Sequence, residues 1–129
     1  MAFTVIQIDH VEVFVRDLDK AAKWYQEVLG LREIHRWQPE PIMIGAGSTK
    51  LALFQARGDV PKTPGVRQVP PALRWHRVAW QTDKEGFQEA QAHLTEHGIK
   101  YRGPIDHQIA RSIYFDDPDG NPLEITYYA

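Results

Sequence analysis

The 129-residue sequence has no cysteine, no long apolar run and no large excess of one charge. Without cysteine, disulfides and thiolate metal sites are excluded, so any metal must be held by histidine, carboxylate, carbonyl oxygen or water. No apolar stretch approaches the roughly 18 residues of a membrane-spanning helix. A net charge of −2 without a clustered basic face argues against nucleic-acid binding. The first residues lack the features of a signal peptide. We therefore expect a cytoplasmic protein with neither a membrane nor a nucleic-acid partner.

What the sequence does contain is an internal repeat, and each copy opens with a histidine on a predicted strand. His10 lies seven residues before Asp17, and His76 lies seven residues before Asp83. Both aspartates lead into a helical pattern that ends at a glycine, and Asp17 is expected to be the N-cap of the first helix. The length suits one domain on a prior of roughly 100–200 residues. We therefore expect two related modules fused into a single domain.

Alternating and helical patterns predict the order β-α-β-β-β in each copy, and hence an α+β fold. The expected strands are 8–15, 31–37, 42–44, 50–55, 75–81, 99–102, 111–116 and 122–128. One helix is expected at 18–29, and a second is expected to follow a capping box at 82–85. Closely spaced prolines between the copies disfavour helix and central strand. The predicted domain covers residues 1–129, with module one at about 5–55, a Pro-rich linker at about 56–73 and module two at about 74–129.

These motifs in this order resemble the vicinal oxygen chelate superfamily, which includes glyoxalase I, extradiol dioxygenases, methylmalonyl-CoA epimerase and the fosfomycin and bleomycin resistance proteins. The resemblance covers nearly the whole chain and rests on residues 9–11, 15–18, 24–25, 29–31 and 114–125. It is specific for the fold and weak for the reaction, because the same frame serves many chemistries. It implies two tandem βαβββ modules whose mixed sheets form a cup around one divalent metal.

The resemblance implies that the metal ligands are His10, His76 and Glu124. By our interpretation of strand parity, all three lie on matching faces. Two histidines and one carboxylate leave coordination positions open for a substrate, and these ligands suit Fe, Mn, Ni, Co or Zn. The alternative for each residue is an incidental one: a satisfied histidine in a sheet, or an exposed glutamate.

One departure from glyoxalase I concerns a second glutamate, which that enzyme places on the last strand of its first module. Here Ala52 stands at that position. Gln55 is three residues further along, an odd offset that points it to the opposite face of the strand. Because the missing glutamate serves as a proton-transfer base in glyoxalase I, the same activity is not expected here.

Two residues are candidates for catalysis. Glu12 shares the face of His10, where it is either a general base or polar anchor, or else a carboxylate at the rim in water. Tyr114 lies ten residues before Glu124, a spacing that resembles the extradiol dioxygenases, where a tyrosine helps to bind and activate the substrate. The alternative for Tyr114 is ordinary packing. His107 lies in the preceding loop, nearer to Tyr114 than the dioxygenase pattern places its base histidine.

The sequence thus predicts a metal-dependent enzyme that acts on a small substrate, which chelates the metal through neighbouring oxygens. We slightly favour dioxygenase-like chemistry, because the ligand set is a triad and Tyr114 is available. One alternative is an isomerase or lyase that uses Glu12 as its base. Others are a metal-free drug-binding protein of the bleomycin resistance type and a module whose partner chain holds the active site. By resemblance we expect a homodimer.

Overall fold

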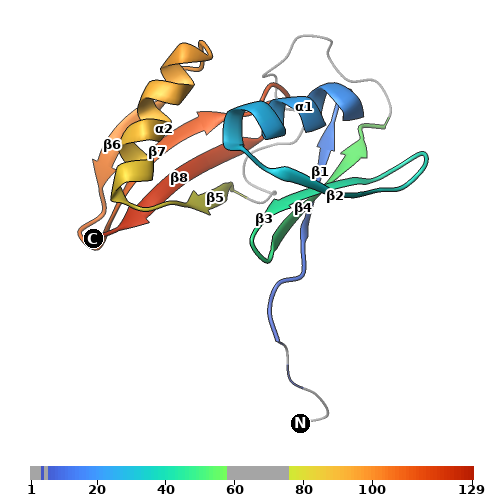
Figure 1. The fold of residues 1–129 in the computed structure, drawn as a ribbon, viewed down its shortest axis with the longest axis horizontal. Helices are drawn as coiled ribbons and strands as arrows, with labels where there is room; N and C mark the ends of the chain where they lie inside the picture. The colour runs from blue at the N-terminus through green and yellow to red at the C-terminus, as the bar shows by residue number, and fades with distance from the viewer. Residues whose placement is uncertain (1–3, 5, 58–75) are drawn as a thin grey trace. The chain divides into compact units, whose positions relative to one another are not determined.

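The computed structural model describes residues 4, 6–57 and 76–129, which belong to two compact units, Met1–Val60 and Pro61–Ala129. Unit 1 consists of β1 (Val11–Val15), α1 (Leu18–Leu29), β2 (Arg32–Arg36), β3 (Ile42–Ala46) and β4 (Thr49–Gln55). Unit 2 consists of β5 (Val78–Gln81), α2 (Lys84–Glu96), β6 (Arg102–Asp106), β7 (Ala110–Asp116) and β8 (Pro122–Tyr128). The predicted α+β fold with two βαβββ modules is confirmed (Figure 1). The predicted linker lies outside the described residues except for 56–57.

Both sheets have the same strand order, β1-β4-β3-β2 in unit 1 and β5-β8-β7-β6 in unit 2. In each, the first and last strands of the module pair in parallel at one side, and the remaining pairs are antiparallel. The first strands begin later than expected, at Val11 and Val78, so His10 and His76 both precede their strands.

No helix in the described part of the chain is long and apolar enough to cross a membrane.

Helix α1 forms where the sequence predicts it. The Asp17 side chain accepts a hydrogen bond from the Lys20 amide at 3.1 Å, which satisfies one of the amides left free at the helix start. Gly30 ends the helix in the left-handed conformation, with φ of 67°. Tyr25 is buried on the face that α1 turns toward the sheet, where Leu51 and Leu53 of β4 are also buried. The helix therefore covers one face of its sheet, and the opposite face carries Glu12, Phe14 and Ala52.

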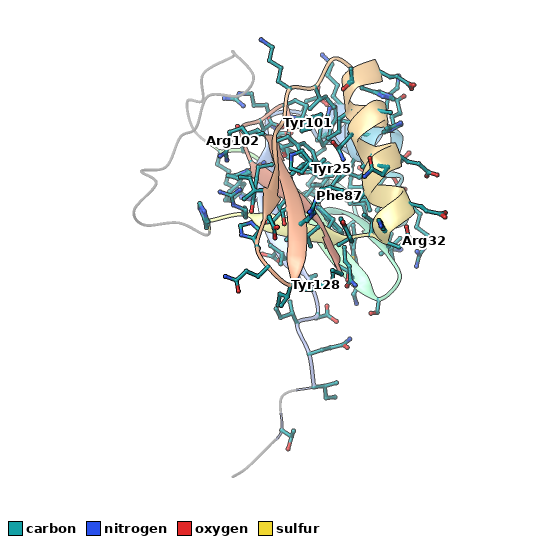
Figure 2. All side chains as sticks on the ribbon, turned by 90° about the vertical axis from the view of Figure 1, so that its left-hand side faces the viewer. Tyr25, Arg32, Phe87, Tyr101, Arg102 and Tyr128 are labelled. Carbon is teal, nitrogen blue, oxygen red and sulfur yellow. The ribbon has the colours of Figure 1, made fainter. Side chains whose placement is uncertain are left out.

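Helix α2 packs on the unit 2 sheet through Phe87, whose ring lies 4.9 Å from that of Tyr127 between centroids (Figure 2). The face of β8 that carries Tyr127 is thus the face that α2 covers. The N-cap of α2 is Asp83, which accepts from the Gly86 amide at 2.7 Å. The capping box predicted from Thr82 is therefore wrong by one residue, because the aspartate outcompetes the threonine for this role.

Strand β6 is a second correction, since it spans Arg102–Asp106 and not 99–102. Gly103 and Pro104 are typical of a strand end, but here Gly103 takes a φ of 104° and the strand continues through a register shift between Arg102 and Ile105. The irregularity is thus absorbed inside the strand. It leaves Arg102 paired with Tyr114 of β7.

Candidate functional site

In unit 1, His10 is held between two carboxylates. Its Nδ1 lies 2.8 Å from Asp9 and its Nε2 lies 2.9 Å from Glu12. The hydrogen bond to Asp9, and after it the one to Glu12, raises the pKa of His10 above its usual 6.5. Asp9 in turn has a lowered pKa, because it accepts from His10 and from Lys50 Nζ at 3.0 Å. The protonated imidazole therefore suits this cluster, and a metal would have to displace one of the two carboxylates to reach a ring nitrogen.

In unit 2, strand pairing places a row of side chains on the sheet face opposite α2. Glu124 of β8 pairs with Tyr114 of β7, and Tyr114 pairs with Arg102 of β6. On its other side Glu124 pairs with Ala79 of β5. Paired residues point to the same face, and the neighbours of Glu124 along β8 point toward α2. We call this set the Glu124 row: Ala79, Glu124, Tyr114 and Arg102.

Tyr114 is the centre of this row and is only 9% exposed. Its hydroxyl forms a 2.5 Å hydrogen bond with His107 Nε2 from the loop between β6 and β7. Two guanidinium groups lie over its ring, with Cζ of Arg77 4.4 Å and Cζ of Arg102 5.3 Å from the ring centroid. Arg102 is the first residue of β6, and Tyr101 just before it lies on the side of α2, where its hydroxyl donates to Gln91 Oε1 at 3.4 Å (Figure 2). The structure thus joins Tyr114 to His107 and adds two arginines that sequence reasoning missed.

The register of β5 places Arg77, and not His76, at the position equivalent to His10. Ala79 opposes Glu124 just as Glu12 opposes Ala52 in unit 1. Since His10 lies two residues before Glu12, its counterpart lies two before Ala79. Five residues separate Glu12 from its helix cap Asp17, but only four separate Ala79 from Asp83. Counting back seven residues from both caps therefore misaligns the modules by one residue.

The same shift corrects our parity interpretation of β5. Trp80 pairs with Ile125 and so points to the face covered by α2. A regular strand extended backward would send His76 to that face as well. His76 is instead exposed before the strand, with its Nε2 2.9 Å from Arg77 Nη2. Its side chain therefore does not follow the pattern on which its role as a ligand was predicted.

The ligand triad of His10, His76 and Glu124 stays a prediction. His10 belongs to unit 1 and the other two residues belong to unit 2. Within the ranges that the structure describes, no group of three or more His, Asp or Glu side chains is placed to hold a metal ion. The donor types of the three residues suit a divalent metal. The placement of His76 does not fit, because Arg77 takes the position equivalent to His10.

The remaining candidates are engaged in local contacts. The Glu12 carboxylate bonds His10 and has 58% of its side chain exposed. Gln55 donates from Nε2 to the Arg16 carbonyl at 2.5 Å, so its amide is committed away from the position of Ala52. Glu124 is half-buried and, among the described residues, has no hydrogen-bond or ion-pair partner. Glu124 is therefore the carboxylate that is most available for chemistry.

A model of the Glyoxalase/Bleomycin resistance protein/Dioxygenase superfamily matches residues 7–125. The chain belongs to this superfamily. It is 25% identical over 118 residues to catechol-2,3-dioxygenase of Bacillus subtilis (strain 168). The matched region covers 92% of this chain but only 40% of that protein. Among solved structures, the glyoxylase/bleomycin resistance protein/dioxygenase domain from Frankia sp. EAN1pec has a TM-score of 0.78 at 18% identity, covering 98% of this chain and 94% of that one.

A further solved structure is the fosfomycin resistance protein FosX from Listeria monocytogenes. It has a TM-score of 0.75 at 17% identity, and the match covers 98% of this chain and 96% of that chain. At this identity the likeness concerns the fold alone. Superfamily membership and fold are therefore established, and the reaction must be argued from the residues of this chain.

Proposed function

We propose that this protein is an enzyme that acts on a small substrate with neighbouring oxygens, held against the Glu124 row. The observation that carries the proposal is the arrangement of three groups around one position: the Tyr114 hydroxyl, its 2.5 Å hydrogen bond to His107, and the adjacent Glu124 carboxylate. The Tyr114 phenol, hydrogen-bonded to the His107 imidazole, can donate or accept a proton, and the Glu124 carboxylate can accept one. These groups suit proton transfer at the oxygens, or beside a carbonyl, of a bound substrate.

In this scheme the three side chains have distinct roles. Glu124 removes a proton from the substrate, since its carboxylate has no partner among the described residues. Tyr114 hydrogen-bonds the substrate oxygen on which charge develops, and His107 holds the tyrosine hydroxyl in place. The name of the Bacillus subtilis relative supports a substrate of this kind, because catechol carries two adjacent oxygens.

The metal-dependent form of the proposal has His10, His76 and Glu124 as ligands of Fe, Mn, Ni, Co or Zn, with dioxygenase-like chemistry ahead of an isomerase or lyase reaction. The β5 register counts against His76. The steps supported by the described residues are therefore those of Glu124, Tyr114 and His107.

A second candidate is binding without catalysis, as in the bleomycin resistance branch of the superfamily. The observation that favours it is Arg77 at the position equivalent to His10. A guanidinium has five donors and no lone pair to offer a metal, so it recognises an anion instead.

Two measurements on tag-free protein test these proposals. The first is metal content by mass spectrometry for the wild type and for His76→Ala: near-stoichiometric metal that the variant loses supports the metal-dependent form, and its absence on reconstitution contradicts that form. The second is turnover of a panel of catechols, hydroxy-ketones and epoxides. We expect Tyr114→Phe to lower turnover by about tenfold or more.

Tyr128→Phe is the matched control for Tyr114→Phe, because Tyr128 shares the Glu124 face of β8 but is 60% exposed. It should leave turnover unchanged. Turnover at the wild-type rate in Tyr114→Phe and in Glu124→Gln would contradict the proposed catalytic roles of these residues. Tight ligand binding without turnover of any panel compound would favour the second candidate.

A further inference from the structure

Unlike Arg36, Arg57 and Arg111, the two arginines Arg77 and Arg102 have no carboxylate partner among the described residues. Arg36 bonds both Asp19 and Glu33, and Arg111 lies 4.0 Å from Asp106. Arg77 and Arg102 instead lie over the ring of one tyrosine, Tyr114, at 4.4 and 5.3 Å from the centroid.

The ring attracts each guanidinium by a modest cation–π interaction, which leaves N–H donors of both groups for other partners. An oxyanion bound beside the ring would accept charge-assisted hydrogen bonds from these donors. Arg77 has donors to spare, because among the described residues its guanidinium makes a single hydrogen bond, from Nη2 to His76 Nε2 at 2.9 Å. Arg102 is exposed and extends from β6 on the face of the Glu124 row.

We infer that Arg77 and Arg102 form an anion-binding subsite beside Tyr114, which takes the carboxylate or phosphoryl group of a small molecule. This inference rests on the proposed function and names the substrate class for the same site. The anionic end lies against the arginines. Glu124 repels it, so the uncharged oxygens of the molecule face Glu124 and the Tyr114 hydroxyl. The charges on this sheet face therefore give a bound substrate one orientation.

The test is isothermal titration calorimetry of the full chain with three probes: benzoate, phenyl phosphate and the neutral benzyl alcohol. We expect one of the two anions to bind and the alcohol to bind at least about tenfold more weakly, since hydrogen bonds to charged groups contribute roughly 1.5–3 kcal/mol. The anion that binds with the higher affinity, benzoate or phenyl phosphate, identifies the oxyanion that the subsite takes.

Arg77→Gln and Arg102→Gln should each weaken binding of that anion by roughly tenfold or more. Arg111→Gln is the matched control, because Arg111 is three residues from Tyr114 on the same strand and so points to the other face. It should bind like the wild type. Arg77→Lys keeps the charge without the planar fork and should give an intermediate affinity, which covers the case in which Arg77→Gln does not fold.

Two results would overturn the inference: no binding of either anion by folded wild type, or equal anion affinity in the wild type, Arg77→Gln and Arg102→Gln. Glu124→Gln separates this failure from that of the proposed function. It should bind the anion as well as the wild type or better, because a repelling charge is gone, while turnover is lost. Anion binding with undiminished turnover in Glu124→Gln contradicts only the proposed role of Glu124 as the base.

Discussion

The two sheets of this protein have the same strand order and matching registers, but they place their carboxylates on opposite members of one strand pair. In unit 1, Glu12 on the first strand faces Ala52 on the last. In unit 2, Ala79 on the first strand faces Glu124 on the last. Each sheet therefore keeps one acid and one alanine at this position, and the exchange decides which strand presents the acid.

The position before the first strand differs in charge balance as well. His10 in unit 1 is surrounded by Asp9 and Glu12, so its positive charge is neutralised locally. Arg77 in unit 2 lies over the ring of Tyr114, as does Arg102. One repeat frame thus holds a charge-balanced cluster in one copy and, in the other, two arginines without a carboxylate partner among the described residues.

The largest expected effect is on catalysis, and it should differ between variants of Glu124 and of Glu12. Glu124→Gln should lower turnover about 100-fold or more, because a general base contributes roughly 10²–10⁴-fold. Glu12→Gln should change turnover much less, since Glu12 is committed to His10. Steady-state kinetics on both variants checks this. A larger loss in Glu12→Gln would instead support the isomerase or lyase alternative with Glu12 as base.

The second effect is on stability, and it comes from placing an acid on both strands of the unit 1 pair. Ala52 is 1% exposed and directly opposite Glu12. Ala52→Glu should lower the free energy of unfolding by about 1–3 kcal/mol, because it overpacks the position and opposes two carboxylates. The double variant with Glu12→Ala copies the pair of unit 2 and should recover part of the loss. Urea denaturation measures both, and equal stabilities of the single and double variants would show that charge repulsion contributes nothing.

The third effect makes unit 2 resemble unit 1 at the position of His10. Arg77→His introduces an imidazole beside Glu124 where the wild type has a guanidinium, which cannot bind a metal. We expect Co(II) or Zn(II) affinity to rise at least about tenfold, on the scale by which supporting groups alone change metal affinity. Co(II) absorption spectra measure this. Unchanged affinity, together with loss of metal in His76→Ala, would show that His76 is the ligand after all.

The smallest effect is the pH dependence of the His10 cluster, because its groups are largely exposed. The pKa of His10 is raised in the folded state by Asp9 and Glu12, with Lys50 bound to Asp9 on the far side. The stabilisation from protonated His10 is therefore complete below pH 6.5 and is lost as pH rises through the raised pKa. The difference in Tm between the wild type and His10→Gln should shrink across this range. A difference that is constant with pH would rule out the charged cluster.

Local sequence predicted the parts of the fold that local physics controls. The helix at Leu18–Leu29 and the strand at Pro122–Tyr128 have the expected bounds. The cap at Asp17 and the turn at 117–121 need only residues close in the chain, and the buried Asp117 side chain accepts from the Asp119 and Asn121 amides at 2.8 Å. The candidate site was predicted only in part, through Glu124, Tyr114 and the nearby His107.

The sequence by itself determined the repeat, the Asp17 cap of α1 and the identity of the chemical groups, because periodicity and short-range hydrogen bonds involve neighbours in the chain. Only the tertiary structure decided which residues share a sheet face. Distance from Asp83 aligned His76 with His10, whereas pairing with β8 aligns Arg77. Arg77 lies over Tyr114, 37 residues along the chain, only because both strands pair with β8. A shift of one residue reverses the face of every side chain in a strand, and strand register is set by the partner strand.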